Sequence, residues 1–538
     1  MIFRRALFLV LTGLALSAGG CGRRESPAAA GVATQTLLIG NYAEPADLDP
    51  QIQYTFTDAN ISYALFEGLT AIDERTALPV PALAERWDVS PDGLVYTFHL
   101  RPTGRWSNGD PVTAADFAFS FRRILRPALG VQYSYMLWPI KNARPFNAGK
   151  LTDFSQVGVA AVDDYTLRIT LEKPTPYLPA LAAHNTWMPV PRATIEKFGR
   201  DDERATRWTR EGNIVGNGPF VLKQWTPNDR IVVEKNPLYW DAAHVRLQRI
   251  VFFPIENAET EELDFRAGQL HATYYVPIAK VPVYREHDPD KLRADPWLAS
   301  VYLAFNTTRP PLNNVKVRRA LTLGMDRDAI VRDVLAGTRT PARSLTPPNC
   351  AGFTARAQVA DDFAAARQLL VAAGYPGGRG LPVFEIQVNT DSLSTKTTEA
   401  IQAMWLRELG VHATITPIET KTLYQNQQLL NYTIGYSGWV GDYADPSTFL
   451  NQYLTGGGNN WTGWGNPEFD RMIAAAENTG DNARRYECFQ KAEAILQADA
   501  PVAPIYFDTR VYLIAPALHG WEPSLIGSHQ YKKMWLEN

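Results

Sequence analysis

The sequence predicts a mixed α/β fold, and two patterns carry this prediction. Residues 96–100 alternate apolar and more polar side chains, which is typical of a half-buried strand. In the second half of the chain, apolar runs at 384–388 and 411–415 flank a helical pattern at 396–409. Strand–helix–strand units of this kind indicate partly parallel sheets that are covered by helices.

The other elements follow from the same periodicities and from capping residues. Thr113 is a suitable N-cap, because Asp116 lies in the first turn that follows it. Gly374 and Gly410 stand where the C-caps of helices belong. Apolar or alternating runs predict further strands at 36–40, 165–171, 232–234 and 249–255, and helical spacing predicts helices at 315–335, 360–374, 467–478 and 482–498.

Length and charge narrow the class of protein. A chain of 538 residues is long enough for three or four domains or for two large lobes. Its formal charge of −3 argues against nucleic acid as the main partner, because a surface that neutralises phosphates usually shows as a basic excess. The 45% of apolar residues is ordinary for a soluble globular protein.

The first residues resemble an export signal rather than a part of the fold. Arg4 and Arg5 precede a short apolar run that ends in small residues before Cys21. We interpret residues 1–20 as a signal peptide, Cys21 as a lipidated N-terminus and residues 21–35 as a flexible tether, with an ordinary cleaved signal as the alternative. The mature protein is then periplasmic and contacts the membrane through its lipid anchor alone.

The cysteines are too few for a disulfide scaffold or a four-thiolate metal site. Cys350 and Cys488 could form a disulfide in an oxidising compartment. Cys488 lies in a helical pattern, however, so a buried free thiol is the alternative.

Catalytic motifs are absent from the sequence. The glycines at 456–458 lack the lysine of a phosphate-binding loop, and the histidines are isolated along the chain. Ser437, in GYSGW, misses the GxSxG pattern of a nucleophile elbow. We therefore predict that the protein is not an enzyme and that it uses no cofactor or metal.

A series of short segments carries a family resemblance. From about Leu38 to the C-terminus, the sequence resembles the family 5 extracellular solute-binding proteins of oligopeptide and dipeptide ABC importers, and most of all their oligopeptide-binding branch. The matching segments, in family order, are AEPADLDP (43–50), LFEGL (65–69), PALAERW (81–87), YTFHLR (96–101), WSNGDPVTAADFAFSFRRIL (106–125), GNGPF (216–220), KNPLYWDA (235–242), FNT (305–307), VRRALTLGMDRDAI (317–330), GWVGDYADPSTFL (438–450) and APIY (503–506).

The resemblance implies a type II periplasmic-binding-protein fold, in which two α/β lobes with mixed sheets are joined by a hinge and an extra domain packs on the first lobe. On this basis, lobe I comprises residues 36–66, 192–297 and 507–538. The extra domain comprises 67–191, and lobe II comprises 298–506.

A zwitterionic peptide needs a carboxylate for its ammonium group, strand-like backbone partners and roomy pockets. The resemblance assigns the first role to Asp442, which on composition alone is a turn or helix-cap residue. It also assigns pairing with the backbone of the ligand to Gly438 and Val440.

The resemblance places aromatic side chains around the ligand. Trp439 would form a wall of the site, although a core tryptophan is the alternative. Tyr133 matches a family tyrosine near the amino end of the peptide. Tyr54 and Phe56 would line the opposite side of the cleft.

Four positions depart from the enterobacterial oligopeptide-binding pattern. Gln427 and Tyr436 replace arginines that receive peptide carboxylates, Thr420 replaces a pocket tryptophan, and Ser394 replaces a histidine. A longer peptide whose carboxylate reaches solvent, or a modified peptide such as a muropeptide, fits these changes. A nickel chelate, haem, an opine-like compound or an oligosaccharide bound by the same fold is the other alternative.

The expected mechanism is closure of the two lobes around the ligand. Closure would exclude water, strengthen the pairing of Asp442 with an ammonium group and create a surface for the ABC-importer permease. We predict a monomer whose partners are an oligopeptide and the permease subunits.

Overall fold

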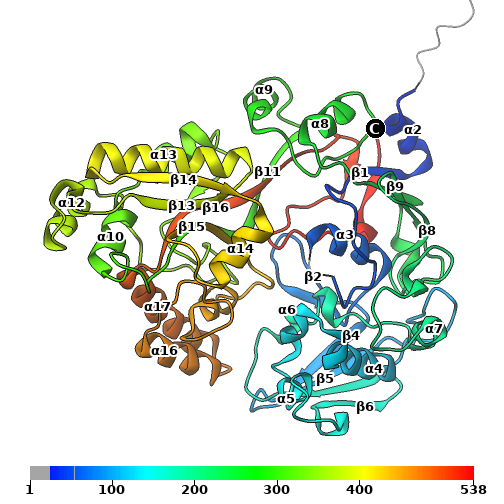
Figure 1. Ribbon diagram of the computed structural model, residues 1–538. Helices are drawn as coiled ribbons and strands as arrows, with labels where there is room; N and C mark the ends of the chain where they lie inside the picture. Colours follow the sequence, from blue (N-terminus) through cyan, green and yellow to red (C-terminus); the bar gives the residue numbers. More distant parts are fainter. Residues whose placement is uncertain (1–24, 54) are drawn as a thin grey trace, which may run out of the picture.

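The computed structural model describes residues 25–53 and 55–538, except for the side chains of residues 420 and 421. Figure 1 shows two bodies of α/β structure, with the long strands β11 (Leu292–Phe305) and β16 (Val502–Leu513) running between them. The predicted signal peptide, Cys21 and Tyr54 lie outside the described residues.

Part of the predicted tether is helical. Residues Pro27–Thr34 form α2, which begins at the N-cap Ser26. The amide of Ala28 donates to the carbonyl of Gly268 at 2.9 Å, and a ring nitrogen of His271 lies 2.9 Å from the carbonyl of Ala28. The prediction of a flexible tether is therefore wrong for these residues, because both hydrogen bonds fix the helix to the folded body.

The largest sheet has the strand order β12-β16-β11-β15-β13-β14. β11 runs antiparallel to β16 and β15, whereas β13 runs parallel to both β14 and β15, which confirms the predicted parallel pairing. The β11–β16 register shifts between Pro296 and Ser300, at the centre of the two long strands. The shorter strands are β12 (Thr340–Pro341), β13 (Phe384–Asn389), β14 (Ala413–Ile418) and β15 (Ile434–Val440).

Two further sheets lie in the body opposite the one that contains most of the largest sheet (Figure 1). The first has the order β1-β10-β9-β8 and the second β4-β5-β7-β6, and both contain the strands predicted for their regions. The strands are β1 (Thr36–Gly40), β4 (Ala84–Val89), β5 (Val95–Leu100), β6 (Val159–Asp163), β7 (Thr166–Thr170), β8 (Phe220–Thr226), β9 (Arg230–Lys235) and β10 (Arg249–Phe253), and the short pairs are β2 (Thr70–Ile72) with β3 (Pro79–Pro81) and β17 (Leu518–His519) with β18 (Trp535–Leu536).

The helices confirm most of the predicted ends. The amide and hydroxyl of Thr113 donate to Asp116 at 2.8 and 2.9 Å, and Gly410 ends its helix with a φ of 67°. The helices are α3 (Phe56–Leu65), α4 (Ala114–Ile124), α5 (Ala143–Asn147), α6 (Leu178–Leu181), α7 (Arg192–Phe198), α8 (Ala258–Arg266), α9 (Val281–His287), α10 (Val315–Leu323), α11 (Arg327–Ala329), α12 (Phe363–Ala372), α13 (Ser392–Leu409), α14 (Thr420–Gln428), α15 (Ser447–Leu450), α16 (Pro467–Glu477) and α17 (Asn482–Asp499).

One predicted helix, 315–335, is interrupted. α10 ends at Gly324, where a Cβ would lie 2.6 Å from the side chain of Leu409. Asp326 then caps a new start by accepting from the amide of Ala329 at 2.8 Å. The break follows from this close packing of the glycine against α13, which helical periodicity does not reveal.

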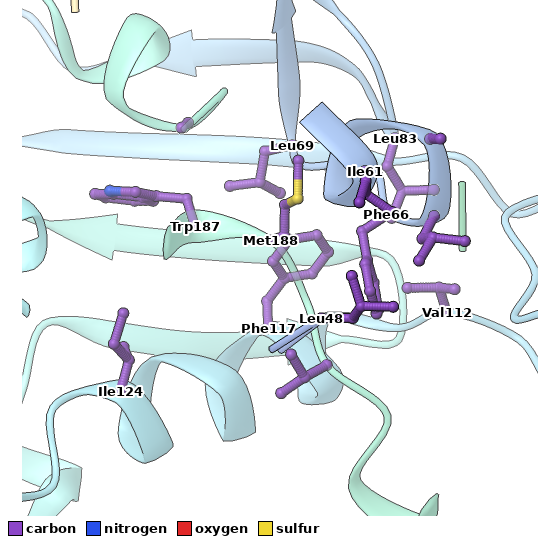
Figure 2. Packing of buried hydrophobic residues seen from close by; sticks show 14 of the residues in the cluster. Leu48, Ile61, Phe66, Leu69, Leu83, Val112, Phe117, Ile124, Trp187 and Met188 are labelled. Atoms are coloured by element: carbon purple, nitrogen blue, oxygen red, sulfur yellow. The ribbon is translucent and has the colours of Figure 1, made fainter. Parts of the chain in front are cut away.

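Each body has its own apolar core. Figure 2 shows Ile61 of α3, Phe117 of α4 and Met188 turned toward a shared interior in the body that contains β1 and β5. A separate cluster, which includes Leu303 of β11, packs between the largest sheet and its helices. Both described cysteines are free, which contradicts a disulfide between them. Cys350 is buried, whereas Cys488 is only half-buried, so the free thiol predicted for Cys488 is confirmed but its burial is not.

Candidate functional site

The candidate site is built around the end of β15 and the loop that follows it. β15 pairs with β13 only through Ile434 and Gly435, so its later residues have β11 as their single strand neighbour in the described part of the chain. A side chain, that of Gln427, takes the place of a strand beside Tyr436, because its Nε2 donates to the carbonyl of Tyr436 at 3.0 Å. One edge of β15 beyond Tyr436 is therefore open.

Hydrogen bonding to β11 determines which backbone groups are free on this edge. The amide of Gly441 donates to the carbonyl of Leu298 at 2.7 Å, and the antiparallel register pairs Trp439 with Ser300. Hydrogen-bonded and non-bonded positions alternate along an antiparallel pair. Trp439 therefore directs its backbone groups to β11, whereas those of Gly438 and Val440 point away from it.

The open edge borders a cavity of about 240 Å³, and a second cavity of about 60 Å³ adjoins it. The cavities share Phe56, Tyr133 and Asp442, so residues from distant parts of the chain form one continuous cleft. Aromatic side chains form a large part of its walls, and the other aromatic residues of the larger cavity are Tyr302, Tyr424, Trp439, Tyr453 and Trp461.

Aromatic contacts beside the cleft connect segments that are far apart in the chain. The rings of Tyr177 and Tyr443 stack with centroids 5.0 Å apart and planes inclined by 2°. Phe56 packs edge-on against Trp297 with centroids 5.3 Å apart. The site therefore lies between facing surfaces rather than on one exposed face.

Asp442 is the acidic group of this cleft. The hydroxyl of Tyr135 donates to its Oδ2 at 3.1 Å, and its amide donates to Thr448 Oγ1 at 3.2 Å. Burial raises the pKa of Asp442 to about 7, although the hydrogen bond from Tyr135 lowers it. No ion pair between described residues includes Asp442, so its ionised form has no cationic partner in the protein.

The structure brings most of the predicted site residues together. Gly438, Trp439, Val440 and Asp442 line the larger cavity from one side, and Tyr133 and Phe56 reach it from the other body. The indole Nε1 of Trp439 lies 3.4 Å from Thr448 Oγ1, which fixes one edge of the ring.

The remaining predicted residues do not contribute described side chains to the cavity. Tyr436 is buried and lines neither cavity, and its hydroxyl lies 2.8 Å from that of Tyr506. Tyr54 and the side chain of Thr420 lie outside the described part of the structure. Ser394 is buried and does not line either cavity.

Sequence reasoning missed Tyr135, which lines neither cavity but contacts Asp442 directly. Its position two residues after Tyr133 was the available signal. Trp461, which follows the glycines at 456–458, is a missed residue of the wall.

Among the described residues, one group of acidic side chains is close enough together to hold a metal ion: Asp326, Asp328 and Asp361. Arg343 Nη2 lies 2.8 Å from Asp328 and 2.9 Å from Asp361, and Arg327 also pairs with Asp361. The arginines account for this cluster as an ion-pair network away from the cleft.

A family model, described as bacterial extracellular solute-binding proteins, family 5, matches residues 79–461. This chain belongs to that family. The family is one of solute-binding proteins, which supports the prediction of a binding protein rather than an enzyme. The periplasmic oligopeptide-binding protein OppA of Salmonella typhimurium is 35% identical to it over 95% of this chain and 94% of OppA.

Solved structures share the two-lobed fold, as predicted. The Escherichia coli murein tripeptide binding protein MppA matches with a TM-score of 0.81 and 33% identity over 93% of this chain and 98% of MppA. Haemophilus influenzae OppA in complex with the peptide RPPGFSPFR matches with a TM-score of 0.78 and 30% identity, over 94% of this chain and 99% of OppA. Within the described residues, no helix combines the length and the apolar character that a membrane crossing requires.

Proposed function

We propose that this protein is the extracytoplasmic binding component of an ABC importer and that it binds oligopeptides in the cleft at Asp442. The observation that carries this proposal is an unpaired carboxylate next to an open strand edge. A peptide can satisfy both features, because its α-ammonium pairs with the carboxylate and its backbone hydrogen-bonds to the open strand edge.

The names of the relatives support the same cargo. OppA of Salmonella typhimurium is named as an oligopeptide-binding protein, and the Haemophilus influenzae structure holds a nine-residue peptide. MppA is named for a murein tripeptide, so a muropeptide belongs in any ligand panel.

We also propose the cellular setting. Residues 1–20 direct export, Cys21 carries the lipid and the mature monomer delivers its cargo to the permease subunits. OppA of Salmonella typhimurium and MppA of Escherichia coli are named as periplasmic proteins, which agrees with this location. A Cys21→Ser variant should move from the membrane fraction to the soluble fraction, and a variant that stays with the membrane would contradict lipidation.

The lobe boundaries belong to the same proposal. The register shift between Pro296 and Ser300 in β11 lies beside the proposed boundary at residues 297 and 298. A register shift interrupts regular pairing, so this part of the two strands is a suitable hinge for lobe closure.

Isothermal calorimetry with matched ligands tests the proposed site. An oligopeptide with a free N-terminus should bind at least a hundredfold more tightly than its N-acetylated form, because acetylation removes the ammonium group and leaves Asp442 unpaired. Asp442→Asn should remove most of this difference. Equal affinities of the two peptides for the wild-type protein would remove Asp442 from the binding site.

A further inference from the structure

The described lining of the cleft carries a single formal charge. Asp442 is the only acidic or basic side chain among the described residues that line its two cavities, apart from His184 in the smaller one. Burial lowers the pKa of His184 to about 4, so this ring is neutral at physiological pH. The described lining therefore offers no cation to a bound anionic group.

Several of the neutral donors in the larger cavity are already engaged. Gln452 Nε2 donates to the carbonyl of Thr448 at 3.0 Å, and Trp461 Nε1 donates to the carbonyl of Gly458 at 3.0 Å. These side chains are held by the protein and cannot turn to solvate a ligand anion without losing a hydrogen bond.

Gln427 is engaged in the same way. Its Nε2 is bound to the carbonyl of Tyr436, and a Cβ at Gly435 would lie 2.6 Å from this nitrogen, so the glycine makes room for the amide. The other atom of the amide, Oε1, is buried without a hydrogen-bond partner in the described structure, and it is an acceptor. Gln427 therefore keeps at most one neutral N–H for a carboxylate and offers it no positive charge.

We propose that the cleft discriminates against a carboxylate and prefers ligands whose only charge inside it is the α-ammonium. This inference rests on the proposed function. Short peptide amides, and long peptides whose carboxylate lies outside the cleft, fit this description. Short free-acid peptides do not, because their carboxylate would be desolvated beside neutral side chains and Asp442. The peptide backbone, rather than a charged end, then fixes the ligand along Gly438 and Val440.

A pair of tripeptides tests the proposal by calorimetry: Ala-Phe-Ala with a free carboxylate and the same sequence as its C-terminal amide. The amide should bind at least tenfold more tightly. The ratio should persist between 0.15 and 0.5 M NaCl, because added salt screens long-range attraction of the net cation but not a desolvated contact. For a nine-residue pair, the acid and the amide should bind within about twofold of each other.

A variant with an added cation sharpens the test. Asn459 lines the larger cavity and is exposed, so it tolerates a longer side chain. Asn459→Lys should bring the tripeptide acid-to-amide ratio toward one by improving the acid. Asn459→Met, which has a similar length and no charge, should keep the tenfold preference for the amide.

The outcomes separate this inference from the proposed function. If the tripeptide acid binds as tightly as the amide, and both depend on Asp442, the inference is wrong and the proposed function stands. If neither tripeptide nor either nine-residue peptide binds, both are wrong. If Asn459→Met narrows the ratio as much as Asn459→Lys, charge is not the cause and the inference is also wrong.

Discussion

Two aspartates three residues apart, Asp442 and Asp445, lie in opposite electrostatic environments. Asp445 is buried and accepts two hydrogen bonds from Arg485, each of 2.9 Å, and its Oδ1 also accepts from the amide of Ser447. Asp442 faces the cleft, accepts from Tyr135 and has no cationic partner among the described residues. The same short loop thus holds one carboxylate that is satisfied by the fold and one that is left for a ligand.

The comparison shows that residues far away in the sequence decide whether a carboxylate is paired with a cation. Arg485 lies on α17, 40 positions after Asp445, and its guanidinium also lies 5.2 Å from the ring centre of Tyr177. A buried ion pair of this kind stabilises its surroundings only while both partners are present. The two aspartates should therefore respond in opposite ways when their environments are changed.

The largest expected effect is on stability, at the paired aspartate. Arg485→Met leaves Asp445 buried without its cation and should lower the free energy of unfolding by about 3–5 kcal/mol. Urea unfolding followed by tryptophan fluorescence measures the loss. The double variant Arg485→Met with Asp445→Asn should recover a part of it. An unchanged unfolding midpoint for the single variant would show that the pair is not structural.

The second effect is on ligand binding at the unpaired aspartate. Peptide affinity should fall about tenfold for each pH unit below 7, because the pKa of Asp442 is about 7 and only its ionised form pairs with the ammonium. The ammonium itself stays mostly protonated below pH 7, since its ordinary pKa is about 7.7–8.0. Calorimetry between pH 5 and 7.5 at constant ionic strength measures the slope, and Asp442→Asn should show none. A flat profile for the wild type would contradict the raised pKa.

The third effect is on the stability of the ligand-free protein. The pKa of Asp442 is raised in the folded state from its ordinary value of 3.8, so ionisation destabilises folding. This penalty is absent below about pH 4, grows as the pH rises to 7 and is complete above 7. Asp442→Asn should therefore be more stable than the wild type at pH 8, by about 1–2 kcal/mol after allowance for water at a half-buried group. The two proteins should be equally stable near pH 4, and a variant that is less stable at pH 8 would contradict this account.

Local sequence signals account for much of the fold but not for the electrostatics of the site. The alternation in β5 and the Thr113 cap are local, so they could be predicted. The break at Gly324 could not, because its cause is contact with Leu409 on another helix.

In the candidate site, too, local sequence predicts some features and contacts between distant residues decide the others. The segment around Asp442 was found from its motif, yet the motif contains both aspartates and does not distinguish them. Tyr436 was predicted in the pocket but lies three residues before Trp439, on the opposite face of the strand, where it contacts Tyr506. Strand alternation alone does not exclude it, because Gly438 and Val440 lie on the same face as Tyr436 and line the cavity. The contact with Tyr506, which is distant in the sequence, is what holds this side chain elsewhere.

The smallest effect concerns the single hydrogen bond that Asp442 does receive. Tyr135→Phe removes the 3.1 Å contact to Oδ2, and because this bond lowers the pKa of Asp442, the pKa should rise further. The pH midpoint of peptide binding should shift upward by up to about one unit, and affinity at pH 7 should fall by about 0.5–1.5 kcal/mol. Tyr133→Phe is the matched control, since the rings of Tyr133 and Tyr135 are neighbours with centroids 5.4 Å apart, and the hydrogen bond to Asp442 comes from Tyr135. If both variants lowered affinity without moving the midpoint, Tyr135 would act by packing alone, and the electrostatic contrast between the two aspartates would rest on burial and Arg485.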